Sequence, residues 1–218
     1  ATTERFLQTI VSNARRMQRL VDDLLDLSRI EAGRWQPRPE PVEVAMSARE
    51  VVTSLADRAT ARGVTLDVHV PDDASVVYAD PDALRQILTN LVDNSIRYAP
   101  HGLVTCSARA LNGGVEVAVL DNGSGIANEH LSRIFERFYR VDASRSREEG
   151  GTGLGLAIVK HLTEAHGGRV AAESTIGQGT TIRCWFPTPG ADCARVTDAF
   201  RRRQRVVARW GQLAAHDH

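Results

Sequence analysis

The order of helical and strand patterns beyond residue 42 constrains the fold of this 218-residue chain more than any other feature. Helices are expected over about 45–61, 80–98 and 154–166, a strand over 64–69, and hairpins over 103–120 and 169–186. Asn112-Gly113-Gly114 suits a hairpin turn, and Gly167-Gly168 suits the end of a helix. Because strands and helices do not alternate strictly, the pattern favours an α/β (α+β) two-layer sandwich over a doubly wound parallel sheet.

Residues 1–33 predict one long helix with a heptad seam, closed by Gly33 as a C-cap. The seam alternates spacings of three and four and consists of Leu7, Ile10, Ala14, Met17, Val21, Leu24 and Ser28, widened by Leu20 and Leu27. So wide an apolar face requires a partner, and no other segment matches it. We expect a second chain or a segment outside this sequence to cover it; the alternative is packing on its own domain.

Proline and charge divide the rest of the chain. Prolines at 37, 39 and 41 predict an extended linker over 34–41, which leaves 42–188 as the main domain. The tail, 189–218, contains the basic stretch 201–205, which suits a disordered end or a helix that binds a membrane surface or a partner. The chain begins inside a helical pattern without methionine, so we expect a fragment of a longer protein.

Asn90 and Asn94 lie one turn apart on the helix whose start is signalled by Asp80-Pro81-Asp82. Residues four apart share a helix face, and Arg97 and Tyr98 continue that side. Amide oxygens suit Mg²⁺, and arginine suits phosphate. From this segment alone, two surface or capping amides remain an alternative.

Two glycine-rich blocks add the other parts of a nucleotide site. Asp121 follows a predicted strand and enters Asn122-Gly-Ser-Gly125, where a carboxylate can accept from an exocyclic amine while glycines let the backbone approach a flat ring. Taken alone, this block also suits a simple turn. The block 150–155 (GGTGLG) leads directly into a helix, whose N-terminal amides form an anion site without a lysine.

Other phosphate-binding motifs are excluded. The sole lysine, Lys160, is followed by His161, so the chain has no Gly-Lys-Ser/Thr loop of the Walker type. The HRD and DFG signatures of protein kinases are also absent.

In their order, the blocks resemble the catalytic ATP-binding domain of sensor histidine kinases of two-component systems. These domains belong to the GHKL superfamily, with the gyrase-type ATPases, and the resemblance implies a Bergerat-type ATP-binding fold. Residues 86–100 resemble the N box, 121–126 the G1 box, 134–140 the F box, 150–158 the G2 box and 177–180 the last glycine box. The stretch 20–33 resembles the second helix of the dimerisation and histidine-phosphotransfer bundle, which makes 1–33 that helix, without the first.

The resemblance implies a role for each matching position. Asn94 would ligate Mg²⁺, with Asn90 supporting the phosphates and available as a further ligand; Asp121 would hold the adenine amino group, and Tyr98 would line the ring. Arg97 stands where a phosphate-contacting lysine is usual, which keeps the charge but changes its geometry. Arg140 matches an arginine that acts on the γ-phosphate, so the catalytic positions are Asn94, Arg97 and Arg140. The other ATP-contacting positions implied are Gly123, Gly125, Ile126, Gly151, Thr152, Gly153, Leu154, Gly155, Leu156 and Thr180. Residues 127–151 would form a mobile lid.

One position distinguishes transfer of the γ-phosphoryl group from hydrolysis of ATP. Gyrase-type relatives carry a water-activating glutamate one turn before the metal asparagine, and this chain has Asn90 there. Asp93 lies about 100° around the helix from Asn94 and is expected to point elsewhere. Transfer of the γ-phosphoryl group to an external acceptor is therefore favoured.

That acceptor is expected to be a histidine on the first dimerisation helix, and none of the seven histidines has such a setting. We therefore expect a protein-histidine kinase part that cannot phosphorylate itself, with a response regulator, an acceptor helix and a second copy of 1–33 as partners. The alternatives are a GHKL ATPase, a serine kinase of the anti-sigma type, and a nucleotide- or partner-binding module without catalysis.

Composition limits the setting. The formal net charge of +0 argues against a nucleic-acid partner. No apolar run reaches the ~20 residues of a membrane span, so membrane attachment would come only from upstream segments. The 3 scattered cysteines lack CxxC spacing, which favours a reducing cytoplasm.

Overall fold

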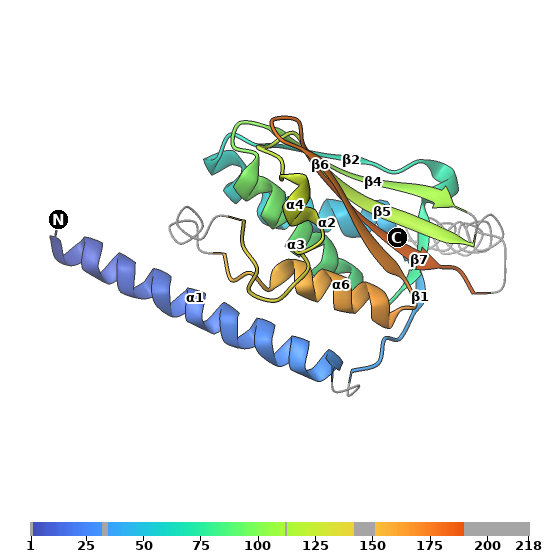
Figure 1. The fold of residues 1–218 in the computed structure, drawn as a ribbon, viewed down its shortest axis with the longest axis horizontal. Helices are drawn as coiled ribbons and strands as arrows, with labels where there is room; N and C mark the ends of the chain where they lie inside the picture. The colour runs from blue at the N-terminus through green and yellow to red at the C-terminus, as the bar shows by residue number, and fades with distance from the viewer. Residues whose placement is uncertain (1, 32–34, 112, 142–150, 190–218) are drawn as a thin grey trace, which may run out of the picture.

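The fold is a helical layer against one mixed sheet, with a long helix alongside (Figure 1). The computed structural model describes residues 2–31, 35–111, 113–141 and 151–189. Three helices, α2 (Val44–Ala61), α3 (Pro81–Tyr98) and α6 (Gly155–Ala165), lie on one face of the sheet. The expected α+β two-layer sandwich is confirmed.

The sheet has five strands in the order β2-β4-β5-β7-β6. Its strands are β2 (Thr65–His69), β4 (Leu103–Leu111), β5 (Gly114–Asp121), β6 (Arg169–Thr175) and β7 (Gly179–Pro187). β2 and β4 are parallel, and the other neighbours are antiparallel. β5 is central and almost wholly buried from Val115 to Val119, so both expected hairpins lie in one sheet. Asn112, expected in the first turn, lies outside the described residues.

The helix α3 begins at the cap and the proline that the sequence predicts. The Asp80 side chain accepts from the backbone N–H groups of Asp82 and Ala83, both at 3.1 Å, and Pro81 occupies the first turn. One stripe of α3 is buried against the sheet, including Leu84, Ile87, Leu88, Leu91, Val92 and Ile96. The adjoining stripe is thereby turned toward α6 and the ends of β5 and β7.

Several short elements of the fold were not predicted from the sequence. β1 (Glu40–Glu43) and β3 (Val76–Ala79) form a separate antiparallel pair, so the end of the expected linker is a strand. A 3₁₀ turn, η1 (Asp72–Ala74), precedes β3, and a single helical turn, α4 (Asn128–Leu131), follows β5. Trp35 packs against the ring of His166, with centroids 6.0 Å apart, so the linker is held against the end of α6.

The first helix, α1 (Thr2–Glu31), runs beside α6 (Figure 1). Leu27 is only 2% exposed and belongs to the domain core, with Leu20 and Ile30 packed against it. The rest of the seam remains exposed: Leu7, Ile10, Met17, Val21 and Leu24. One end of this helix therefore packs on its own domain, and the other keeps an uncovered apolar face, for which a covering chain or segment stays a prediction. Gly33 lies outside the described residues.

In the part of the chain that the structure describes, no helix is long and apolar enough to cross a membrane. The core of the expected lid, 142–150, and nearly all of the tail lie outside the described residues.

Candidate functional site

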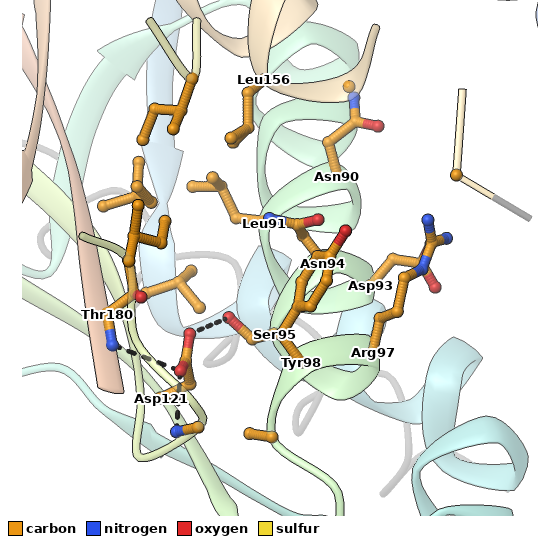
Figure 2. A pocket seen from close by; sticks show the side chains of 18 of the residues that line it. Asn90, Leu91, Asp93, Asn94, Ser95, Arg97, Tyr98, Asp121, Leu156 and Thr180 are labelled. Atoms are coloured by element: carbon orange, nitrogen blue, oxygen red, sulfur yellow. Dashed lines mark hydrogen bonds and ion pairs between the residues drawn. The ribbon is translucent and has the colours of Figure 1, made fainter. Parts of the chain in front are cut away.

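A cavity of about 790 Å³ opens between α3, the ends of β5 and β7, and the N-terminus of α6. This volume lies within the range of about 300–1,000 Å³ typical of small-molecule sites. Figure 2 shows its two ends: Asp121 and Thr180 lie at one, and Asn90 and Leu156 at the other.

Asp121 forms the first end of the cavity. Its Oδ2 accepts from the Ser95 hydroxyl at 3.0 Å, and its Oδ1 accepts from the N–H groups of Gly123 and Thr180 at 3.0 and 3.3 Å. Three donors from three segments thus fix the carboxylate at the end of β5 (Figure 2). A carboxylate offers about four lone-pair positions, so capacity remains for a donor on a ligand.

The glycines beside Asp121 hold the backbone close. A Cβ on Gly123 would collide with the Tyr98 carbonyl oxygen, and one on Gly125 (φ +69°) with the Thr175 carbonyl oxygen. Ser174 completes this corner: its hydroxyl accepts from the Ile126 N–H at 2.8 Å and donates to the Gly179 carbonyl at 2.7 Å. The loop after β5 is therefore tied to the β6–β7 turn.

Asn90 and Asn94 line the wall of the cavity from one face of α3, one turn apart (Figure 2). The first residue of α6 approaches Asn90 closely, because a Cβ on Gly155 would lie 3.1 Å from Asn90 Oδ1. Asn90 Oδ1 therefore lies near the start of α6, and Asn94 lines the same wall one turn further along α3. Amide oxygens are the donor type that Mg²⁺ accepts.

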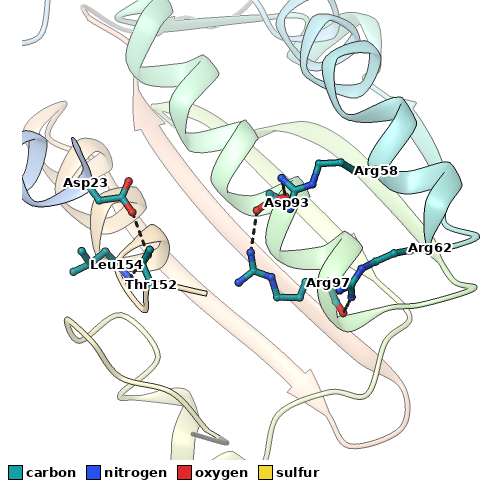
Figure 3. A network of polar contacts seen from close by, with 7 residues as sticks. All are labelled: Asp23, Arg58, Arg62, Asp93, Arg97, Thr152 and Leu154. Atoms are coloured by element: carbon teal, nitrogen blue, oxygen red, sulfur yellow. Dashed lines mark hydrogen bonds and ion pairs between the residues drawn. The ribbon is translucent and has the colours of Figure 1, made fainter. Parts of the chain in front are cut away.

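Arg97 is held by an ion-pair network that runs across two helices (Figure 3). The Asp93 carboxylate accepts from Arg97 Nη2 at 3.2 Å and also pairs with Arg58 of α2. Asp93 thus faces its arginines, as expected for a residue turned away from Asn94. A Cβ on Gly151 would collide with Arg97 Nη1, which places that guanidinium against the glycine loop.

Arg140 brings a second cation to the same loop. Its Nη2 is buried and has no hydrogen-bond partner among the described residues, and it lies 3.9 Å from the place of a Gly151 Cβ. A buried cationic N–H without an acceptor is costly, so this geometry suits an anionic ligand. Phe138 (φ +60°), two residues before Arg140, donates its N–H to the Gly153 carbonyl at 2.9 Å. This bond ties the segment that carries Arg140 to the glycine loop.

The start of α6 offers backbone donors at this second end. The first-turn N–H groups of an α-helix have no partner within the helix, and the N-cap residue of α6, Leu154, makes no side-chain cap. The Thr152 hydroxyl accepts from the Leu154 N–H at 3.2 Å, which fixes the loop before the helix. Uncapped amides at the positive end of a helix, together with two arginines, suit phosphate groups.

The structure brings nearly all of the predicted site residues to this one cavity. Those that line it are Asn90, Asn94, Arg97, Tyr98, Asp121, Gly123, Gly125, Ile126, Arg140, Gly151, Thr152, Gly153, Gly155, Leu156 and Thr180. Leu154 is the exception, because its side chain is fully buried in the core. Sequence reasoning missed Ser95, Ser174 and Asp23, which hold site residues in place; a lone serine or aspartate carries no motif that would have identified them.

Known protein families match both parts of the chain. A family described as "Histidine kinase-, DNA gyrase B-, and HSP90-like ATPase" matches residues 79–190, and the "His Kinase A (phospho-acceptor) domain" matches residues 1–33. The fold and site thus define an ATPase domain of the GHKL type. The chain belongs to the sensor histidine kinases within this family, as the resemblance implied.

Curated relatives of the chain are named as sensor histidine kinases. The chain is 37% identical over 187 residues to the sensor-like histidine kinase SenX3 of Mycolicibacterium smegmatis, a match that covers 85% of this chain and 48% of SenX3. It is 36% identical over 186 residues to the sensor histidine kinase WalK of Bacillus subtilis, covering 84% of this chain and 30% of WalK. The chain therefore spans half or less of the length of these relatives.

Solved structures share the fold. Full-length ShkA in complex with AMPPNP superimposes with a TM-score of 0.74 at 31% identity, over 88% of this chain and 40% of that one. The Acinetobacter baumannii histidine kinase AdeS superimposes with a TM-score of 0.72 over 86% of both chains. At 22% identity, that second likeness shows the fold alone.

Proposed function

We propose that this chain binds ATP in the cavity and donates its γ-phosphoryl group to a histidine outside this sequence. The observation that carries the proposal is the polarity of the site: a fixed carboxylate at one end, and two arginines with uncapped helix amides at the other. Adenine presents an amine, and the triphosphate presents negative charge. The AMPPNP bound by ShkA, a relative in fold and sequence, is an analogue of ATP and supports this class of ligand.

Each end has a defined role in this proposal. Asp121 accepts from the adenine amine, while Tyr98 lines the ring. Arg97, Arg140 and the amides at the start of α6 hold the phosphates and stabilise the charge that develops during transfer. Because Asp93 fixes Arg97 from behind, that cation is positioned before the nucleotide arrives.

Magnesium fits the amide pair on α3. Asn94 would hold the ion, with Asn90 as a further oxygen ligand near the phosphates, and the ion would supply charge neutralisation and orientation of the phosphates.

The cavity favours transfer over hydrolysis. Of the described residues that line it, three carry carboxylates, and each is engaged: Asp23 accepts from the Thr152 hydroxyl, Asp93 pairs with two arginines, and Asp121 accepts three hydrogen bonds. Asn90, where gyrase-type relatives place the water-activating acid, cannot act as a base. An imidazole nitrogen brought in line with the γ-phosphorus is therefore the better nucleophile.

The same assignment extends to the partners. The match of residues 1–33 to a phospho-acceptor domain and the exposed seam of α1 support a homodimer through this helix. We assign residues 34–41 to the linker, 42–188 to the catalytic domain, and the phosphorylated histidine to a separate helix. A response-regulator aspartate would receive the phosphoryl group next, in the cytoplasm.

The test supplies the missing acceptor. This chain is mixed with Mg²⁺, γ-labelled ATP and a separately made pair of dimerisation helices from a SenX3-type kinase, and acid-labile label is followed on the added histidine. Label that disappears with Asn94→Ala in this chain, or with acceptor histidine replaced by glutamine, is the expected result.

Two outcomes would contradict the proposal. Steady release of inorganic phosphate without labelled histidine would identify an ATPase. Failure to bind ATP with Mg²⁺ would leave only a partner-binding module.

A further inference from the structure

Asp23 connects α1 to the glycine loop at the phosphate end of the cavity. It lies one helical turn before Leu27, whose burial in the core fixes this side of α1 toward the domain. The Thr152 hydroxyl donates to Asp23 Oδ2 at 3.1 Å (Figure 3). The same hydroxyl accepts from the Leu154 N–H through a lone pair, so it both donates to α1 and receives from the start of α6.

Asp23 brings a negative charge to the end of the cavity where Arg97 and Arg140 are positively charged. Thr152 adjoins Gly151, against which Arg97 and Arg140 converge, and Asp23 lines the same cavity. The cations attract phosphate, whereas the carboxylate repels it. With the base at Asp121, the proposed function puts the terminal phosphate, the group farthest from the base, at the glycine loop that Asp23 contacts.

We propose that Asp23 discriminates between nucleoside triphosphate and diphosphate at this site. The inference rests on the proposed function, since it takes the phosphates to lie at the glycine loop. MgATP carries one more negative charge than MgADP, so the carboxylate opposes ATP more strongly. A ligand shifts a conformational equilibrium only by its differential affinity, so ATP weakens the contact between Asp23 and Thr152 more than ADP does.

The test compares two affinities in one protein. The dissociation constants of MgATP and MgADP are measured by titration calorimetry in low salt for the parent, Asp23→Asn and Asp23→Glu. Asp23→Asn keeps an oxygen for Thr152 but removes the charge, so it should tighten ATP relative to ADP by about threefold to thirtyfold, the range for one charge at several ångströms. Asp23→Glu keeps the charge and should stay within about twofold of the parent ratio.

Asp22→Asn is the matched control. Asp22 is the neighbouring acid on α1 and is exposed, so its charge is screened and its removal should leave the ratio unchanged. The gain from Asp23→Asn should also shrink at high salt. Far-UV circular dichroism and thermal melting establish that all variants are folded alike.

The outcomes separate this inference from the proposed function. An unchanged ATP-to-ADP ratio in Asp23→Asn, with both nucleotides still bound, overturns the discrimination and leaves the ATP site standing. An equal effect of Asp22→Asn also overturns it, because the charge would then act without the contact to Thr152. A parent that binds neither nucleotide overturns both proposals.

Discussion

Replacing Asp121 by asparagine tests how the base is recognised. The variant keeps a carbonyl oxygen for the N–H groups of Gly123 and Thr180, and the Ser95 hydroxyl can rotate to accept from the new amide. The fold should therefore survive with a loss of about 1–2 kcal/mol in the free energy of unfolding, since charge-assisted bonds become neutral ones. A change in thermal midpoint of a few degrees would reflect this loss.

The effect on ATP should be larger. The amide N–H₂ presents a donor where the adenine amine needs an acceptor, and leaving such a group unpaired costs about 1–3 kcal/mol. At about 1.4 kcal/mol for each factor of ten, ATP should bind about fivefold to 150-fold more weakly. ITP has a carbonyl oxygen in place of the amine, so Asp121→Asn should narrow or reverse the preference for ATP over ITP.

The assay measures both nucleotides by calorimetry in the presence of Mg²⁺. Ser95→Ala is the control, because it removes one supporting donor and keeps the carboxylate; it should retain the preference for ATP. If Asp121→Asn bound ATP and ITP in the same ratio as the parent, Asp121 would not contact the base, and the orientation of the nucleotide in the cavity would be wrong.

Three further changes test the surroundings of the site. Asp93→Asn should weaken ATP binding about tenfold but leave adenosine binding unchanged, because Arg97 loses the ion pair that aims it at the phosphates. Gly125→Ala should lower the free energy of unfolding by about 3 kcal/mol or more, since its Cβ meets the backbone of β6. Gly177→Ala has a similar φ of +76° but open space around it, and should lose only about 1–2 kcal/mol in chemical denaturation. Burial raises the pKa of Cys184 to about 12, so iodoacetamide at pH 8 should leave it unmodified in the folded protein, whereas peptide mapping after unfolding should find it modified.

The same pKa predicts how stability depends on pH. The thiol of Cys184 loses its proton at a lower pH in the unfolded chain than in the folded one. Its contribution to stability is therefore fully present below pH 9 and is lost as pH rises toward 12.

Local signals account for much of the fold. Asp80 and Pro81 begin α3 where the sequence places a cap and a first-turn proline, and Gly167-Gly168 follows the end of α6. These elements were predictable because each is determined by neighbours along the chain. The pair β1 and β3 was not, since Glu40–Glu43 has a proline-rich context and pairs with residues about 36 positions away.

The residues of the site also fall into two groups, those that the sequence predicts and those that only the fold brings together. Asn94, Arg97 and Asp121 stand in recognisable blocks, so their meeting in one cavity could be expected from the sequence. The hydrogen bond between Thr152 and Asp23 depends on how α1 packs on the domain. The hydrogen bond from Ser95 to Asp121 depends on the packing of α3 against β5. Such contacts join residues that are distant in sequence, and only the assembled fold brings them together.

The pairing of β5 with β7 has a consequence for how this protein can vary. Asp121 lies directly opposite Thr180 in the register, and the Thr180 N–H helps to fix the carboxylate. A single residue inserted into β7 would shift that amide away and turn the strand's side chains to the other face. Insertions should therefore be tolerated at the opposite end of the same strands, near Gly113, where a Cβ meets nothing within 4 Å. Descendants of this domain can diversify there without altering which base they recognise.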